Sequence, residues 1–282
     1  MPIFSLVIQF HNRGRDARKI IHNLRSTCPF PHEIIAIDDG SKDNTLRTLV
    51  KECTGGDEFV FHANNLFEIK TYNRALHLTR GLYIGFFQDD DYAPDSTWCV
   101  SAEKILREDC YKNIAILGGR DGLFISPLDI YPDTQNAVRW ARKSFLDWEP
   151  GRYFHWHGVC NYGLVTQSDL KGRTPPCLVD AVNMAPFIVR RTVALTLGGF
   201  DEAFAPFQAN DVDFCLRAIK ANYKVAVYNS GIIQGFYKGG MRRSKTSRLR
   251  TTRQSFRNWQ LVYKRHSDLI SARSADRKLT VG

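Results

Sequence analysis

Three consecutive carboxylates, Asp89, Asp90 and Asp91, directly follow an apolar run in the stretch YIGFFQDDDYAPD. A second acidic pair, Asp38 and Asp39, follows another apolar run in EIIAIDDGS. Carboxylates crowded together repel one another unless a cation or hydrogen-bond donors compensate. Hard cations such as Mn²⁺ and Mg²⁺ select oxygen ligands of this kind. The triple Asp therefore predicts a divalent metal site, with a solvated acidic turn as the alternative for either cluster alone.

A third pair of carboxylates, Asp211 and Asp213, stands in the first turn of a helix predicted to begin at about Asp211. The helix dipole stabilises carboxylates at this end, typically by about 0.3 to 1 kcal/mol, so helix capping is one interpretation. A carboxylate that stays ionised is also suited to act as a general base, because a base must accept a proton.

The chain around these clusters alternates between strand and helix patterns. Strands are predicted over 4–10, 32–38, 58–63 and 82–87, and helices over 15–27, 41–53 and 69–80. Strands joined by crossover helices run parallel, because each helix returns the chain to the same edge. The predicted fold class is therefore α/β, a mostly parallel sheet flanked by helices. Ligands gather at the carboxyl ends of such strands, where the first two acidic clusters lie.

Helical spacing also predicts which residues of the second helix are capping and which are buried. Asp43 or Asn44 is expected to cap the helix over 41–53. Leu46, Leu49 and Val50 are expected to share its buried face.

Size and composition restrict the class of protein. With 282 residues and 43% hydrophobic content, the chain can form one large domain, alone or with an appendage. No apolar run approaches the roughly 20 residues that span a bilayer, and the N-terminus lacks a signal-peptide pattern. We therefore expect a cytoplasmic protein, soluble or peripherally attached to a membrane. Seven scattered cysteines without a CxxC pair predict neither a disulfide framework nor a zinc site.

Four stretches of the chain resemble, in order and spacing, the family 2 glycosyltransferases with the GT-A (Rossmann-like) fold. They are FSLVIQFHNR, EIIAIDDGSKDNT, NRALHLTRGLYIGFFQDDDYAPD and GGFDEAFAPFQANDVDFCLRA. The resemblance covers about residues 3–235, and four motifs in sequence order are far more specific than any one of them. It implies a metal-dependent, inverting transfer of a sugar from a nucleotide-sugar donor.

The resemblance assigns the nucleotide site to the first two strands. Asp39 matches the carboxylate that accepts a hydrogen bond from the uracil ring, with Asp38 beside it, so a UDP-sugar is the expected donor. Gln9 and His11 fall where the family contacts and stacks on the base. A plain loop histidine is the alternative for His11.

Two residues of the third helix also resemble family positions near the nucleotide. Lys70 and Asn73 stand where the family has Lys or Arg and Asn, although Tyr72 stands where many members have Arg. A position on the helix surface explains Lys70 equally well.

The resemblance places the metal-binding DXD motif at the triple Asp in one of two registers. Counting from the family pattern, the first Asp of the motif corresponds to Gln88 and the second to Asp90. If the strand ends one residue later, Asp89, Asp90 and Asp91 are the motif. Asp90 is the expected principal metal ligand, Asp91 the second, and Asp89 lies nearer the ribose. Many members have a metal-binding His where this chain has Gln234.

The Glu-Asp motif of the family corresponds to Asn210 and Asp211, which makes Asp211 the expected catalytic base and Asp213 the first alternative. Asp180 and Asn183 are positioned like acceptor or sugar contacts.

The aromatic-rich segment over 131–180 resembles no family motif and is expected to contact the acceptor, a glycan, lipid-linked or protein group. Trp156 and His157 are its candidate contacts, with core packing as the alternative for most of its aromatic residues. The expected organisation is one GT-A domain over 1–237, with a nucleotide-binding half over about 1–95 and an acceptor-binding half over about 96–237. A basic loop and helix over 238–282 follow it.

That C-terminal segment holds 13 lysine and arginine residues against two aspartates, a net charge of +11 within a chain of +10. Lys238, Arg242 and Arg243 are expected to close over the donor diphosphate. An anionic membrane surface, nucleic acid or plain solvent are the other interpretations. Phe256, Trp259 and Val262 at helical spacing predict that the helix docks on the domain.

Two other function classes explain less of the sequence. A nucleic-acid-binding protein would use the basic segment but leaves the acidic clusters unexplained, so nucleic acid is the less favoured partner. A nucleotidyltransferase of related fold would need a Gly-rich, basic phosphate loop near the N-terminus, which this sequence does not show.

Overall fold

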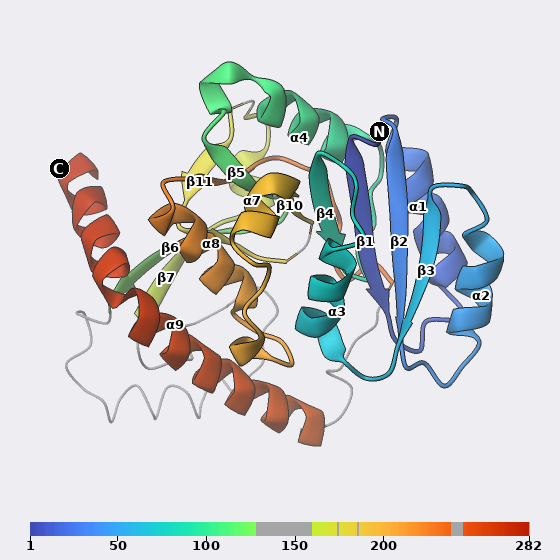
Figure 1. Cartoon of the computed structure of the whole chain (residues 1–282). Helices are drawn as coiled ribbons and strands as arrows, with labels where there is room; N and C mark the ends of the chain where they lie inside the picture. The colour runs from blue at the N-terminus through green and yellow to red at the C-terminus, as the bar shows by residue number, and fades with distance from the viewer. Residues whose placement is uncertain (128–159, 174, 185, 238–244, 282) are drawn as a thin grey trace.

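An eight-stranded sheet forms the centre of the protein in the computed structural model, which describes residues 1–127, 160–173, 175–184, 186–237 and 245–281 (Figure 1). The strand order is β3-β2-β1-β4-β10-β5-β11-β8. The bounds of these strands are β1 Phe4–Phe10, β2 His32–Asp39, β3 Glu58–Ala63, β4 Tyr83–Phe87, β5 Ile114–Gly118, β8 Cys177–Val179, β10 Phe187–Arg190 and β11 Lys224–Val227.

The first four strands are parallel neighbours, as the sequence predicts. β1 lies between β2 and β4, so that Phe10 is level with Asp38 and Ile8 is level with Phe87. The carboxyl ends of these strands therefore meet at one edge of the sheet. β10 enters antiparallel between β4 and β5 and joins this parallel half to the rest of the sheet.

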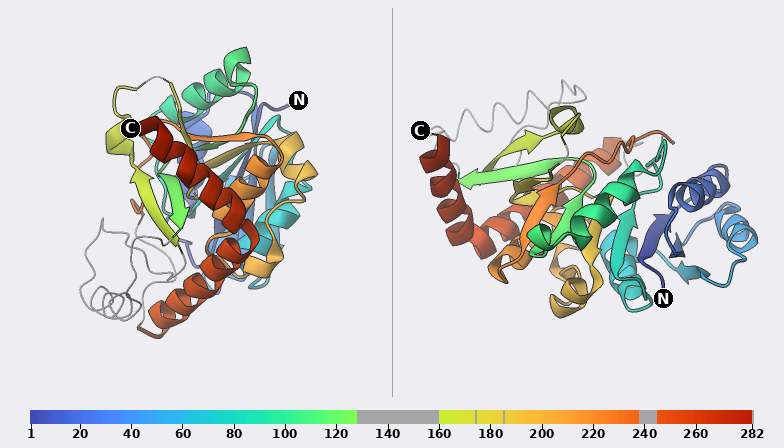
Figure 2. Two further views of the ribbon diagram at one scale, coloured as in Figure 1. Left: turned by 90° about the vertical axis from the view of Figure 1, so that its left-hand side faces the viewer. Right: turned by 90° about the horizontal axis from the view of Figure 1, so that it is seen from above.

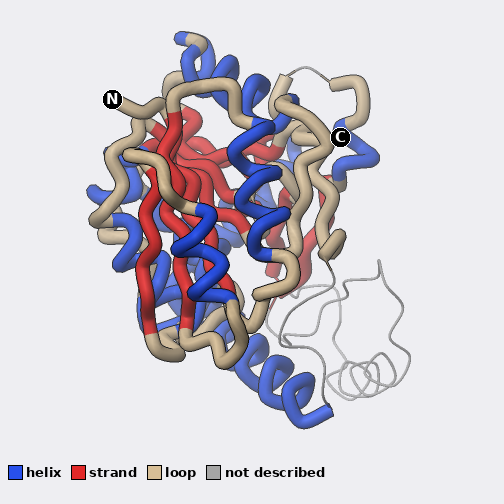
Figure 3. The backbone as a smooth tube through the Cα atoms, turned by 90° about the vertical axis from the view of Figure 1, so that its right-hand side faces the viewer, coloured by secondary structure: helices blue, strands red, loops and turns tan. Residues whose placement is uncertain are grey.

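Helices cover both faces of the sheet (Figures 1 and 3). Alternation along β1 explains this, because Leu6 and Ile8 pack into one hydrophobic core and Val7 into the other. The first face carries α1 (Ala17–Thr27), α2 (Thr45–Glu52) and α4 (Thr97–Arg107). The second carries α3 (Phe67–Leu76), α7 (Arg191–Thr196) and α8 (Asn210–Lys220).

A small antiparallel sheet, ordered β7-β6-β9, lies beside the large one. Its strands are β6 Gly122–Pro127, β7 Cys160–Val165 and β9 Ala181–Val182. The remaining described elements are α6 (Gln167–Leu170), η1 (Asp109–Tyr111), η2 (Glu202–Phe204) and the long C-terminal α9 (Lys245–Val281).

The C-terminal helix α9 docks on the domain, as predicted from its apolar spacing. It crosses α8 and the small sheet (Figure 2). Trp259 and Val262 are buried in the core, and Trp259 stacks on Tyr162 of β7 with ring centroids 5.6 Å apart. Phe256, which was expected to join them, is instead exposed.

The predicted strands and helices are confirmed. On α2, whose predicted buried face was Leu46, Leu49 and Val50, Leu49 is buried, Leu46 is half-buried and Val50 is exposed. Asp43 is the residue that serves the start of α2, since its carboxylate accepts the backbone N–H of Thr45 at 3.0 Å. Within the described parts of the chain, every helix is too short or too polar to cross a bilayer.

Candidate functional site

The carboxyl ends of β1, β2 and β4 bring the first two acidic clusters to one edge of the sheet. Gln9 and His11 end β1, Asp38 and Asp39 end β2, and the triple Asp follows β4. We call this the acidic edge. Parallel strand order explains why residues about 80 positions apart in sequence, from Gln9 to Asp91, meet here.

Asp39 is almost fully buried and organises the base of this edge. One of its oxygens accepts the N–H of Leu66 at 2.8 Å, and the other accepts the N–H of Phe67 at 2.8 Å. Gln9 donates to the same carboxylate at 2.9 Å, and His11 donates to its backbone carbonyl at 2.8 Å. The sequence-predicted nucleotide residues Gln9, His11 and Asp39 therefore form one connected group.

Asp38 lies behind Asp39 with no exposed surface. His62 of β3 donates to its Oδ2 at 2.9 Å, whereas its Oδ1 is buried without a hydrogen-bond partner. A buried acceptor without a donor costs stability.

Arg13 is a buried cation that sequence reasoning missed. Its Nε lies 3.0 Å from Asp89 Oδ2, and its Nη2 donates to the carbonyl of Asp89. Its Nη1 donates to the carbonyl of Tyr237 at 3.1 Å. Arg13 thus joins the loop after β1 to the acidic turn and to the residue that precedes the basic C-terminal segment. Burial raises the pKa of Asp89 to about 6, although the Arg13 charge opposes the shift.

The acidic turn itself places Asp90 and Asp91 differently. Asp91 is buried, and its Oδ2 accepts the N–H of Gln88 at 3.2 Å while its Oδ1 has no hydrogen-bond partner. Burial and the neighbouring charge of Asp90 raise the pKa of Asp91 well above its usual range. Asp90 is half-buried. Gln234 lies beside this turn, with its amide nitrogen 3.4 Å from Gln88 Oε1.

These residues fit a hard divalent cation bound together with a substrate. No three His, Cys, Asp or Glu side chains converge on one point within the described residues. Mg²⁺, however, is usually held by one or two carboxylates together with substrate phosphates. Asp90 and Asp91 supply such a pair of carboxylates.

Asp211 lies in the first turn of α8, where backbone donors fix its carboxylate. Met184 N–H donates to Oδ2 and Val212 N–H to Oδ1, each at 2.9 Å. Burial raises the pKa of Asp211 above its ordinary value, although these hydrogen bonds and the nearby charge of Arg120 oppose the shift. Each carboxylate oxygen accepts two hydrogen bonds or more, so the bound N–H groups leave capacity for a substrate hydroxyl.

Glu68, in the first turn of α3, connects Asp211 with the acidic turn and was also missed. Asn210 Nδ2 lies 3.5 Å from Glu68 Oε1, and Gln88 also donates to this carboxylate. Burial, followed by the negative charge of Asp211, raises the pKa of Glu68 to about 7. In sequence, Glu68 is indistinguishable from an ordinary acidic residue at a helix start. The group of Gln88, Glu68, Asn210 and Asp211 is called the bridge here.

Asp213, the first alternative base, faces the opposite side of α8 and is fully buried. Arg217 donates to its Oδ2 at 2.8 Å and His266 of α9 to its Oδ1 at 2.9 Å. Burial favours a raised pKa, but these hydrogen bonds outweigh it and lower the pKa of Asp213. Asp213 therefore has a structural role in joining α8 to α9.

The structure places the remaining predicted contact residues in different parts of the fold. Asn73 forms two hydrogen bonds with the backbone of Phe200: it donates to the carbonyl at 2.7 Å and accepts from the N–H at 2.8 Å. Asp180 is buried and pairs with Arg273 of α9. Asn183 forms a hydrogen bond with Asp121, which pairs with Arg120, and the Arg120 charge acts on Asp211. Lys70 is half-buried on α3. Trp156, His157, Lys238, Arg242 and Arg243 lie outside the described residues.

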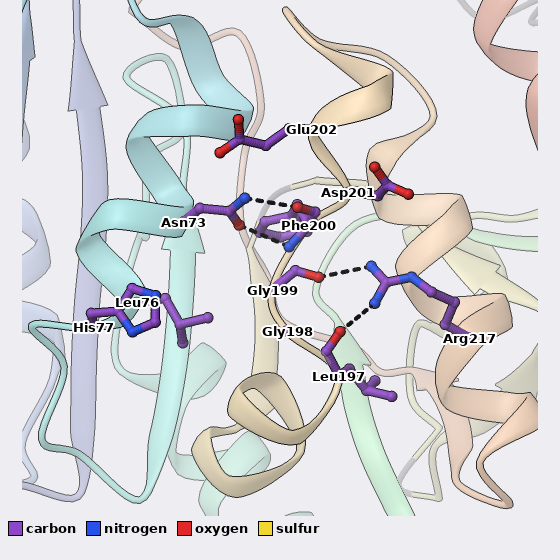
Figure 4. A pocket seen from close by; sticks show the side chains of 10 residues that line it. All are labelled: Asn73, Leu76, His77, Leu197, Gly198, Gly199, Phe200, Asp201, Glu202 and Arg217. Carbon is purple, nitrogen blue, oxygen red and sulfur yellow. Dashed lines mark hydrogen bonds between the residues drawn. The ribbon is translucent and has the colours of Figure 1, made fainter.

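An open hollow of about 560 Å³ lies at the far end of α3 from Glu68 (Figure 4). Asn73, Gly199 and Arg217 line it, and Arg217 is engaged there with the carbonyls of Leu197 and Gly199. Gly199 adopts φ +74°, and a Cβ at this position would lie 2.6 Å from Asn73 Oδ1. The hollow contains none of the residues of the acidic edge, so it is separate from the candidate site.

Comparison with known families matches residues 5–155 to the family described as "Glycosyl transferase family 2". The chain belongs to this family. The match covers more than half of the chain and includes the whole acidic edge up to the triple Asp. A comparison with curated protein sequences gives no significant match.

Solved glycosyltransferases share the fold of this family member. GalNAc-T7, solved with UDP, GalNAc and Mn²⁺, is 14% identical with a TM-score of 0.65, covering 96% of this chain and 50% of its own. The mannosyltransferase PcManGT from Pyrobaculum calidifontis, in complex with GDP-Man and Mn²⁺, is 14% identical with a TM-score of 0.54, covering 89% and 61%. TarS 1-349 from S. aureus, in complex with UDP-GlcNAc, is 20% identical with a TM-score of 0.52, covering 80% and 56%.

At these identities the similarity concerns the fold, and it confirms the GT-A-like α/β architecture predicted from the sequence. The chain spans between half and about three fifths of the length of these solved proteins.

Proposed function

We propose that this family 2 member transfers a sugar from a UDP-sugar to a hydroxyl group of a glycan, lipid-linked or protein acceptor, with inversion at the anomeric carbon. The observation that carries the proposal is the geometry around Asp211. Its carboxylate is fixed by two backbone donors and is connected through the bridge to the acidic edge. This connection supports a catalytic base next to a nucleotide site.

The nucleotide would lie across the ends of β1 and β2. Gln9, His11 and Asp39 are already connected by hydrogen bonds, which lowers the cost of ordering them around a base. Asp38, which follows Ile37 at the end of β2, would support Asp39 from behind through its contact with His62. Neighbours solved with UDP-GlcNAc and UDP support a uridine nucleotide, whereas the GDP-Man neighbour supports guanosine.

Asp90 and Asp91 would hold Mn²⁺ or Mg²⁺ together with the donor diphosphate. Such a cation neutralises the charge that develops on the leaving diphosphate. The pairing of Asp89 with Arg13 favours the register in which Gln88 and Asp90 occupy the DXD positions, because Asp89 is already committed to a cation.

The chemical step is a single in-line displacement. Asp211 accepts the proton of the acceptor hydroxyl, the hydroxyl oxygen forms a bond to the anomeric carbon, and the bond from that carbon to the diphosphate oxygen breaks. The electron pair of the broken bond leaves with the nucleoside diphosphate. Attack from the face opposite the leaving group inverts the anomeric configuration.

A binding and turnover panel tests the proposal. The unmodified protein is titrated with UDP, GDP and dTDP, with and without Mn²⁺, by calorimetry. Its release of nucleoside diphosphate from UDP-glucose, UDP-galactose, UDP-N-acetylglucosamine and GDP-mannose is then measured. We expect UDP to bind most tightly, only with the metal, and a UDP-sugar to be turned over. Tighter binding of GDP would overturn the uridine assignment, and undiminished UDP binding in EDTA would overturn the metal assignment.

A further inference from the structure

The segment that leads into α8 has an unusual backbone. Gln208 and Ala209 have φ values of +81° and +59°, a left-handed conformation that non-glycine residues rarely adopt. Ala209 is the residue directly before α8, and Asp211 follows two residues later. Strained backbone of this kind persists only where surrounding contacts enforce it. The orientation of Asp211 therefore depends on whatever holds Gln208 and Ala209.

A single side chain of the C-terminal helix makes those contacts. Asn258 of α9 has no exposed surface, and its Nδ2 donates to the carbonyls of Phe204, Phe207 and Gln208 at 2.8, 2.9 and 2.8 Å. An amide nitrogen has two protons, so the three carbonyls share them. We call residues 204–208 the entry loop. Asn258 gathers three of its five carbonyls around one nitrogen.

A second residue of α9 fixes the orientation of that amide. Gln254, one turn earlier, donates to Asn258 Oδ1 at 3.0 Å and to the carbonyl of Ala205 at 3.0 Å. With its oxygen occupied in this way, Asn258 must present its nitrogen to the entry loop. The two amides form a connected network, and buried networks of this kind favour one conformation when every member is satisfied.

We propose that Asn258 is a positioning residue for the transfer reaction. By holding the entry loop, it maintains the left-handed backbone at Gln208 and Ala209 that fixes Asp211 against Met184. The inference rests on the proposed function of Asp211. It gives the C-terminal helix a positioning role at the catalytic site in addition to the docking that the sequence predicts. Figure 1 shows α9 passing below α8 at the end where α8 begins.

The first test measures the position of Asp211 without activity. The N–H of Met184 is hydrogen-bonded to Asp211 Oδ2, so its hydrogen exchange reports whether that carboxylate is in place. We expect Asn258→Ala to raise the exchange rate of Met184 at least tenfold, measured by NMR or mass spectrometry, relative to Ile35 in the parallel half. Val262→Ala, a buried apolar truncation on the same helix, is the matched control and should leave that ratio unchanged.

The second test separates binding from turnover. UDP with Mn²⁺ should bind Asn258→Ala within threefold of the unmodified protein, because the entry loop does not belong to the acidic edge. Release of UDP from the UDP-sugar that the unmodified protein turns over should fall at least tenfold in kcat. Val262→Ala should keep kcat within twofold while lowering Tm.

The third test is rescue. Glycine adopts φ > 0 without steric cost. Ala209→Gly should therefore let the backbone before α8 keep its left-handed conformation with less support from Asn258. Ala209→Gly introduced into Asn258→Ala should recover at least threefold in kcat, whereas a merely structural role for Asn258 predicts no recovery. If Asn258→Ala does not fold, Gln254→Ala is measured in the same three ways.

The outcomes separate this inference from the proposed function. Full turnover by Asp211→Asn would remove the proposed base, and the positioning role with it. An inactive Asp211→Asn combined with Asn258→Ala that keeps full kcat and normal Met184 exchange would overturn the positioning role alone.

Discussion

The two sides of helix α8 hold carboxylates two residues apart in opposite electrostatic surroundings. On one side, Asp211 lies among backbone donors near Glu68, and burial raises the pKa of both carboxyls. On the other side, Asp213 is paired with Arg217 and His266, which lower its pKa. Asp213 therefore has cationic partners, whereas Asp211 and Glu68 form no salt bridge within the described part of the chain.

This difference distinguishes structure from chemistry in the acidic residues of this protein. Carboxylates with a cation in hydrogen-bond contact, such as Asp213 and Asp180, tie α9 to the domain. Asp91 and Asp211 have raised pKa values and no cation in such contact among the described residues, and under the proposed function they line the substrate site. Perturbed pKa values of this kind gather at functional sites because catalysis needs groups that are not already neutralised.

The sharpest test of the comparison is the same substitution on each side. Asp211→Asn keeps the shape of the side chain and removes its basicity, so the transfer rate should fall by about 10²- to 10⁴-fold. Binding of UDP with Mn²⁺ should change less than threefold, measured by calorimetry. The product of the unmodified protein should have inverted anomeric configuration by NMR coupling constants. Retained configuration, or Asp211→Asn at full rate, would require another base.

Substitution of Asp213, on the other side of α8, should lower the stability of the protein more than its activity. Asp213→Asn leaves Arg217 and His266 without their anion, so the free energy of unfolding should fall by about 3 kcal/mol, while kcat falls less than tenfold. Denaturant titration measures the loss, with Asp57→Asn as control because its pair with Arg80 is exposed and contributes below about 1 kcal/mol. The lowered pKa means that this stabilisation is present above the unfolded-state pKa and is lost as pH falls through the folded one. A large drop in kcat with unchanged stability would contradict the assignment.

Substitutions in the acidic turn should weaken the metal-dependent binding of UDP. Asp90→Ala should weaken UDP binding in the presence of Mn²⁺ by tenfold or more, about 1.4 kcal/mol. Asp95→Asn removes an equal charge from an exposed position in the same loop and should have little effect. Equal effects of the two substitutions would indicate a general loss of charge and not a lost ligand.

The smallest expected effect is a shift in pH dependence. Asp211 must be ionised to accept a proton, so kcat should fall as pH decreases through its raised pKa, above the ordinary value of about 3.9. The Arg120 charge lowers that pKa, so Arg120→Gln should move the midpoint to higher pH. Arg107→Gln, on the exposed surface of α4, should leave it unchanged. A midpoint that moves to lower pH would contradict the placement of Arg120.

The sequence by itself determined the parallel half of the fold, because local apolar alternation and helical spacing at β1 to β4 agree with the tertiary packing. Strand polarity then brings Asp39 and Asp90 to one edge without further information. Residues that depend on distant partners could not be predicted. Arg13 and Glu68 look like ordinary loop and helix-start residues until Asp89 and Asn210 are placed beside them.

The choice between Asp211 and Asp213 shows most plainly what only the tertiary structure decided. Both occupy the first turn of α8, and the pattern of acidic residues in the sequence does not separate them. Residues two apart on a helix point about 200° away from each other at 3.6 residues per turn. Which direction meets Met184 and which meets His266 depends on how α8 packs between the sheet and α9, and that packing is set by contacts such as that of Asn258 with residues 204–208.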